Sequence, residues 1–117
     1  MKNLSIFLFA ITMISSQAQQ TVSYNDENQK LEGIVSVPEK KIANGNAVLL
    51  LPAWMGIDNN AKENAAELAK LGYLTFVADI YGVDKRPTNP SEAGKLAGYY
   101  KTNIKEYQKR IQLALNE

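Results

Sequence analysis

The 117-residue chain contains no cysteine and no histidine. Their absence excludes disulfide bonds, Cys/His metal centres and any nucleophile–histidine pair within these residues. The carboxylates that could bind a metal are dispersed along the chain. We therefore expect no metal and no cofactor, and a domain that is stabilised by its hydrophobic core alone.

The chain also lacks an excess of either charge. Thirteen basic residues stand against twelve acidic ones, and Lys2 is the only basic residue before Gln19. This balance predicts neither a nucleic acid nor an anionic membrane as partner. Most charges are scattered along the chain, so we expect them to form solvated surface.

No apolar run reaches the roughly 20 residues that a membrane span needs. The longest, residues 4–14, follows Lys2 and precedes Ser16 and Ala18, which place small residues where a signal peptidase reads. This pattern predicts a signal peptide over residues 1–18, cleaved after Ala18, and export to a periplasm or the medium without stable membrane association. The alternative is a buried N-terminal helix. Residues 19–117 then form one small domain or part of one, of undetermined oligomeric state.

Turn residues divide the first part of the domain. Residues 21–24 and 30–37 alternate partly and flank the polar cluster 25–28, which predicts an antiparallel hairpin at a sheet edge. Residues 47–51 are uniformly apolar, which is typical of a strand buried on both faces. Residues 74–78 form a second such run.

Between these two runs the pattern predicts a helix. Asn60 and Glu63 resemble a capping box at the start of this helix. Gly72 can adopt the left-handed backbone conformation that caps its C-terminal end. A strand–helix–strand unit of this length implies a right-handed parallel crossover. Asp58 lies close enough to the helix start to cap it instead.

Two further helices are expected near the C-terminus. Asn89-Pro90 opposes helix, so Ser91 is the expected cap of a helix that reaches about Tyr100. A second helix runs from about Asn103 to the end, and because Glu117 lies within it, we expect the chain to stop in the middle of an element. Its apolar face comprises Ile104, Tyr107, Ile111 and Leu115.

Three short motifs occur in a characteristic order. They are the apolar strand with Pro-Ala-Trp-Met-Gly at 52–56, the helix end at 68–73, and Ala-Asp-Ile-Tyr-Gly at 78–82, with Leu-Glu-Gly upstream at 31–33. Together they resemble the dienelactone hydrolase family. The resemblance implies the N-terminal half of an α/β-hydrolase fold: a mostly parallel sheet with flanking helices and an N-terminal antiparallel hairpin.

The family resemblance also implies a reaction, namely cleavage of a small-molecule ester or lactone by a Cys or Ser nucleophile with an Asp and a His. No Gly-x-Ser-x-Gly occurs in the chain. We therefore expect the triad beyond residue 117, and these 117 residues alone to be inactive.

Matched by position, the resemblance implies that the backbone N–H of Trp54 is an oxyanion-hole donor. It further implies substrate contacts by Ala53, Met55, Tyr81 and Arg86, the last to a substrate carboxylate. Family members usually have Glu where this chain has Ala53, which argues against dienelactone itself as substrate.

Each of these residues also has a structural interpretation. Trp54 and Met55 could be core residues, and Arg86 could be simply solvent-exposed. Asp79 ends a strand where ligands often bind, although such residues more often accept backbone N–H bonds in their own turn. The rival function is a non-catalytic exported α/β binding module whose loop at residues 54–55 binds a partner or a ligand.

Overall fold

The computed structural model describes residues 19–117. The predicted signal peptide lies outside this range, so cleavage after Ala18 stays a prediction. The elements are β1 (Gln20–Asp26), β2 (Gln29–Ser36), β3 (Ala47–Leu50), α1 (Asn59–Lys70), β4 (Leu74–Val77), α2 (Pro90–Thr102) and α3 (Ile104–Leu115). None of the helices in this part of the chain is long and apolar enough to cross a membrane.

The four strands form one mixed sheet in the order β1-β2-β4-β3. β1 and β2 are antiparallel and turn through Glu27, whose φ of 52° is left-handed. β2 pairs with β4 antiparallel, and β4 pairs with β3 in parallel. The predicted hairpin and the predicted parallel strand–helix–strand unit are both confirmed.

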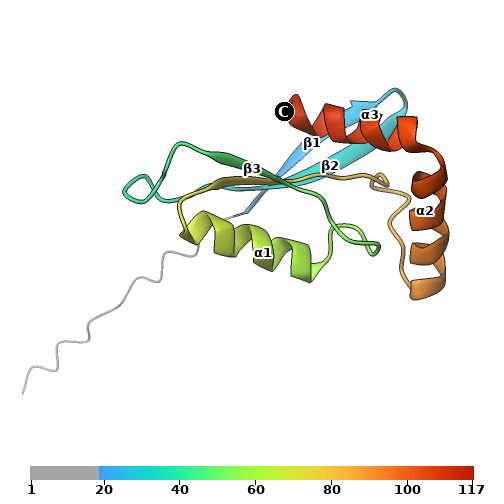
Figure 1. The fold of residues 1–117 in the computed structure, drawn as a ribbon, viewed down its shortest axis with the longest axis horizontal. Coiled ribbons are helices and arrows are strands. Elements are labelled where there is room, and N and C mark those ends of the chain that lie inside the picture. Colours follow the sequence, from blue (N-terminus) through green and yellow to red (C-terminus); the bar gives the residue numbers. More distant parts are fainter. Residues whose placement is uncertain (1–18) are drawn as a thin grey trace, which may run out of the picture.

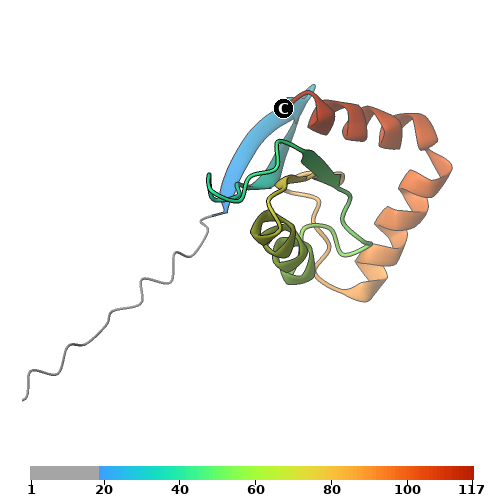
Figure 2. The ribbon, with the colours of Figure 1, turned by 60° about the vertical axis from the view of Figure 1, so that its left-hand side comes forward.

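Helices α1 and α3 lie on opposite faces of the sheet (Figure 1). On one face Ala61 and Ala65 of α1 pack against Val77, and on the other Ala114 of α3 belongs to a cluster with Leu31. Helix α2 stands beyond the end of the sheet and leads into α3, so the two helices form an arc around that end (Figure 2). This arc determines where a cavity can form.

Helix α1 begins two residues earlier than a cap at Asn60 implies, and the alternative cap at Asp58 is confirmed. The carboxylate of Asp58 accepts a hydrogen bond of 2.9 Å from the Ala61 N–H, so Asp58, and not Asn60, is the N-cap. The C-terminal end agrees with prediction because Gly72 has φ of 99°. A Cβ atom there would lie 2.2 Å from the carbonyl oxygen of Ile42, so only glycine fits.

The two C-terminal helices differ from prediction at their ends. Helix α2 begins at Pro90 with Asn89 as its cap, because a proline in the first helical turn has no N–H that needs a partner. Helix α3 ends at Leu115 with Asn116 as its C-cap, so the prediction that Glu117 lies within the helix is wrong.

Strand β3 lies at an edge of the described sheet, with β4 as its neighbour. Within residues 19–117 it is not buried on both faces: its three last residues are only partly buried, and Leu51 beyond it is 42% exposed. In β4, which has neighbours on both sides, Thr75 and Val77 are fully buried. The position of a strand in the sheet therefore decides its burial here.

Candidate functional site

A cavity of about 300 Å³ lies at the carboxyl ends of the parallel strands β3 and β4. Open α/β sheets bind ligands at this end. The loops after both strands and the arc of α2 and α3 border it, and four of its ten lining residues are aromatic. The lining residues are Pro52, Ala53, Trp54, Gly56, Ile80, Tyr81, Ala97, Tyr100, Lys101 and Tyr107. Within residues 19–117, no group of acidic side chains could hold a metal ion.

The loop after β3 contains a tight turn over residues 53–56. The N–H of Gly56 donates to the carbonyl of Ala53 at 2.9 Å, and Gly56 has a φ of 76° that favours glycine. The N–H of Trp54 donates to no acceptor in the part of the chain that the structure describes. The Trp54 side chain is 49% exposed, so its interpretation as a core residue is wrong.

Tyr81 connects the two loops of the cavity. Its hydroxyl donates a hydrogen bond of 2.9 Å to the carbonyl of Trp54. Burial raises the pKa of the Tyr81 hydroxyl, and the nearby hydroxyls of Tyr107 and Tyr100 raise it further. The hydroxyl therefore stays protonated and remains a donor.

Tyrosines of α2 and α3 complete the aromatic wall. The ring centroid of Tyr100 lies 5.6 Å from that of Tyr81 and 6.2 Å from that of Tyr107. Burial is the main cause that raises the pKa of Tyr100. The sequence analysis missed Tyr100 and Lys101 as lining residues and assigned Tyr107 only to the apolar face of a helix. The signal that could have found them is a tyrosine on each of two successive helices.

Asp79 has a structural role next to the cavity. Its side chain is 3% exposed and accepts from the N–H of Gly82 at 3.0 Å and from the N–H of Glu32 at 3.0 Å. Its own N–H donates to the hydroxyl of Tyr24. The prediction that Asp79 accepts a bond in its own turn is confirmed.

The structure brings only some of the predicted site residues together. Ala53, Trp54 and Tyr81 line the cavity, whereas Met55 and Arg86 do not. The guanidinium of Arg86 donates to the carbonyl of Glu32 at 3.0 Å and to the Asp79 carboxylate at 3.3 Å. These two bonds tie the loop after β4 to strand β2.

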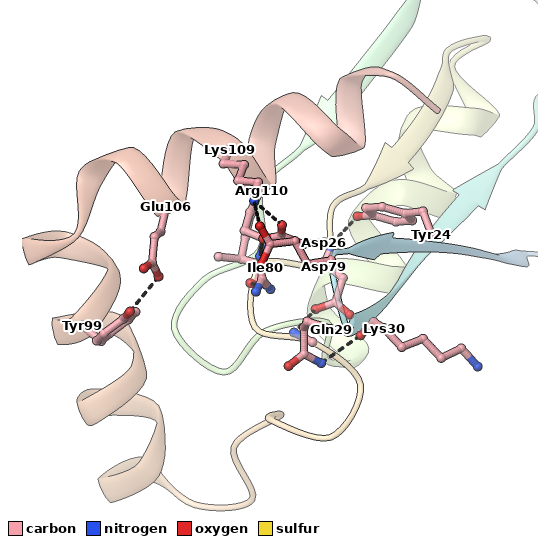
Figure 3. Close-up of polar contacts among 12 residues, drawn as sticks. Tyr24, Asp26, Gln29, Lys30, Asp79, Ile80, Tyr99, Glu106, Lys109 and Arg110 are labelled. Carbon is pink, nitrogen blue, oxygen red and sulfur yellow. Dashed lines mark hydrogen bonds and ion pairs between the residues drawn. The ribbon is translucent and has the colours of Figure 1, made fainter.

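Helix α3 is anchored beside the cavity by Arg110 (Figure 3). Its guanidinium donates to the Asp26 carboxylate at 2.7 Å and to the carbonyl of Ile80 at 2.8 Å. Burial opposes ionisation of Asp26, but hydrogen bonds from Lys109 and Arg110 outweigh it and lower its pKa. The expectation that the charges are solvated is therefore wrong at this cluster.

Comparison with known proteins agrees with this architecture. The sequence model of the dienelactone hydrolase family matches residues 31–117. The crystal structure of the dienelactone hydrolase-like promiscuous phosphotriesterase P91 from metagenomic libraries superposes with a TM-score of 0.75 at 26% identity, covering 85% of this chain and 41% of that one. A structure described as m3DLH gives a TM-score of 0.75 at 20% identity with the same coverage. No curated protein matches the chain. The chain thus spans about two fifths of both solved structures.

Proposed function

Because the chain belongs to the dienelactone hydrolase family, we propose that residues 19–117 form the oxyanion side of a hydrolase active site. The substrate class is an ester or lactone of a small organic acid. A nucleophile, an Asp and a His that follow residue 117 would complete the site. The observation that supports this most strongly is the unpaired N–H of Trp54, in a tight turn beside a cavity at the carboxyl ends of β3 and β4.

The chemistry requires such a donor. When a nucleophile attacks an ester carbonyl, negative charge develops on the carbonyl oxygen, and backbone N–H groups that already point at it stabilise that charge. In α/β-hydrolases one of these donors comes from the loop between the third strand and the following helix. Trp54 occupies that loop, and its N–H makes no competing bond within residues 19–117.

The cavity favours a small substrate. Its volume of about 300 Å³ and its aromatic wall suit a compact molecule with a flat or apolar group. The likeness at 26% identity to a phosphotriesterase makes phosphotriesters a second substrate class for testing.

The donor can be deleted by a single substitution. Proline lacks an N–H and fits the second position of a β-turn, which Trp54 occupies, so Trp54→Pro removes the donor and keeps the turn. Trp54→Ala keeps the N–H and removes the indole. In the gene-encoded protein we expect Trp54→Pro to lower kcat on p-nitrophenyl acetate by about 10²–10³. We expect Trp54→Ala to lower it less than about 10-fold.

Each outcome of this comparison is informative. Equal losses in the two variants would mean that the indole, and not the N–H, matters. If the gene-encoded protein hydrolyses no ester, lactone or phosphotriester, the hydrolase proposal fails and the non-catalytic α/β binding module takes its place. A gene that continues into Gly-x-Cys-x-Gly or Gly-x-Ser-x-Gly with a later His would support the enzyme.

A further inference from the structure

Tyr81 makes two separate contacts with the turn over residues 53–56. Its hydroxyl donates to the carbonyl of Trp54 at 2.9 Å. Its ring lies against Gly56, where an added Cβ atom would meet the ring at 3.4 Å. Both contacts are directed at the backbone of the turn. The first uses the hydroxyl proton, which is therefore not free for a substrate.

We propose that Tyr81 is a positioning residue that holds this turn, and with it the Trp54 N–H, in one orientation. The part of the proposal that concerns catalysis rests on the proposed function. The role differs from the substrate contact that the sequence suggested for Tyr81, because the hydroxyl is directed at the protein backbone.

The contact adds to the preference of the turn for one orientation of its central peptide, which the hydrogen bond of the turn does not fix by itself. The bond from the Gly56 N–H to the Ala53 carbonyl closes a turn in which Met55 has no positive φ, as in a type I turn. A type II turn, which differs by a flip of the peptide between Trp54 and Met55, needs a positive φ at Met55. A flip would exchange the directions of the Trp54 carbonyl and the Met55 N–H and reverse a peptide dipole beside the donor. Methionine at position 55 already disfavours the flipped form, and the Tyr81 hydroxyl disfavours it further by binding the carbonyl.

Tyr81 is itself held from both sides, so it can hold the turn rigidly. Its ring packs against Tyr100 with 5.6 Å between centroids. The residue before it, Ile80, accepts a bond from Arg110, and the residue after it, Gly82, donates to Asp79. The hydroxyl is thus presented by a well-supported segment.

Tyr81→Phe tests the proposal because it deletes the hydroxyl and keeps the ring. In the gene-encoded protein we expect hydrogen exchange over residues 53–57 to become about 5-fold faster or more, with exchange in β4 unchanged. We expect kcat on p-nitrophenyl acetate to fall about 10-fold with KM changed less than about 2-fold. Tyr99→Phe is the matched control, since Tyr99 is 46% exposed and its hydroxyl binds Glu106 outside the cavity. It should change neither quantity.

A double variant shows whether Tyr81 acts through the donor. In the Trp54→Pro background, Tyr81→Phe should cause no further loss of kcat, because the group that it positions is already absent. Independent, multiplying losses would overturn the proposal, and so would unchanged exchange over residues 53–57. A raised KM with unchanged kcat would show substrate binding instead.

The exchange measurement separates this inference from the proposed function. Faster exchange over residues 53–57 in a protein without hydrolase activity would support Tyr81 as the residue that holds the turn and would refute the hydrolase. Unchanged exchange in an active enzyme would refute the role of Tyr81 and leave the hydrolase intact.

Discussion

Asp79 stabilises the loop after β4 because its two carboxylate oxygens accept three hydrogen bonds. The donors are the N–H groups of Gly82 and Glu32 and the guanidinium of Arg86. Glycine is required at position 82, where φ is 102° and a Cβ atom would collide with the side chain of Gln29. The buried Asp79 carboxylate and the compact turn at Gly82 therefore fix the backbone on both sides of Tyr81.

Asp79→Asn should destabilise the gene-encoded protein by about 2–4 kcal/mol, since the amide has one acceptor oxygen and its NH₂ would face buried donors. Urea unfolding measures the change. Asp84→Asn is the control, because Asp84 is exposed in the same loop and accepts a bond from Gln29. A shift for Asp84→Asn as large as that for Asp79→Asn would show that burial is not the cause.

At the scale of elements, α3 is attached to the β1–β2 hairpin by charged side chains. Lys109 and Arg110 contact the two oxygens of Asp26 at 2.6 and 2.7 Å. The side chains of Arg110 and Asp26 are each 12% exposed, so solvent screens this pair less than it screens the other ion pairs of the surface. The pair sets the distance between the hairpin and the helix that carries Tyr107.

Asp26→Asn should lower the free energy of unfolding by about 1–3 kcal/mol at pH 7. Because the folded protein lowers the pKa of Asp26, its contribution is complete above the unfolded value of about 4 and disappears as pH falls through the folded value. The stabilities of wild type and variant should therefore converge in acid. Urea unfolding between pH 7 and pH 3 measures this convergence.

Glu27→Gln provides the control for this experiment. Glu27 contacts the same Lys109 at 3.5 Å, but its side chain is 84% exposed. Its removal should leave the pH profile nearly unchanged. A constant gap between wild type and Asp26→Asn at every pH would contradict the assigned role of the ionised carboxylate.

At the scale of the whole molecule, residues 19–117 leave the β3 edge and part of one face of the sheet uncovered. β3 presents unpaired backbone groups along Ala47–Leu50, with no Lys or Pro in the strand to discourage pairing. Beside it an apolar groove of about 280 Å³ runs between the sheet and the end of α3. Leaving ~300 Å² of apolar surface uncovered forfeits roughly 7 kcal/mol, comparable to the stability of a small domain.

A polypeptide that comprises only residues 19–117 should therefore associate or lose fixed packing. The gene-encoded protein should melt cooperatively. Size-exclusion chromatography, near-ultraviolet circular dichroism and thermal melts on both proteins measure the difference. A monomeric 19–117 polypeptide with a fixed signal from Trp54 and a sharp melt would show a self-sufficient domain and favour the binding module.

The sequence by itself determined the elements and their local connections. Alternation predicted the hairpin, the apolar runs predicted β3 and β4, and Gly72 predicted the end of α1, because each depends on residues close in the chain. Only the structure explains why the motif at residues 31–33 has these residues. Leu31 is fully buried, and a Cβ atom on Gly33 would collide with the ring of Phe76. Local patterns thus identified the α/β architecture without its contacts.

Only the tertiary structure decided the site. The bond between the Tyr81 hydroxyl and the Trp54 carbonyl joins residues 27 positions apart, and Arg110 and Asp26 are 84 positions apart. Such partners cannot be read from spacing, because side chains of one type serve equally as surface, core or site until the fold places a neighbour beside them. For the same reason the sequence did not predict the partners of two charged residues. Arg86, assigned to substrate or solvent, binds Glu32 and Asp79, and Asp26, assigned to the solvated surface, binds Arg110.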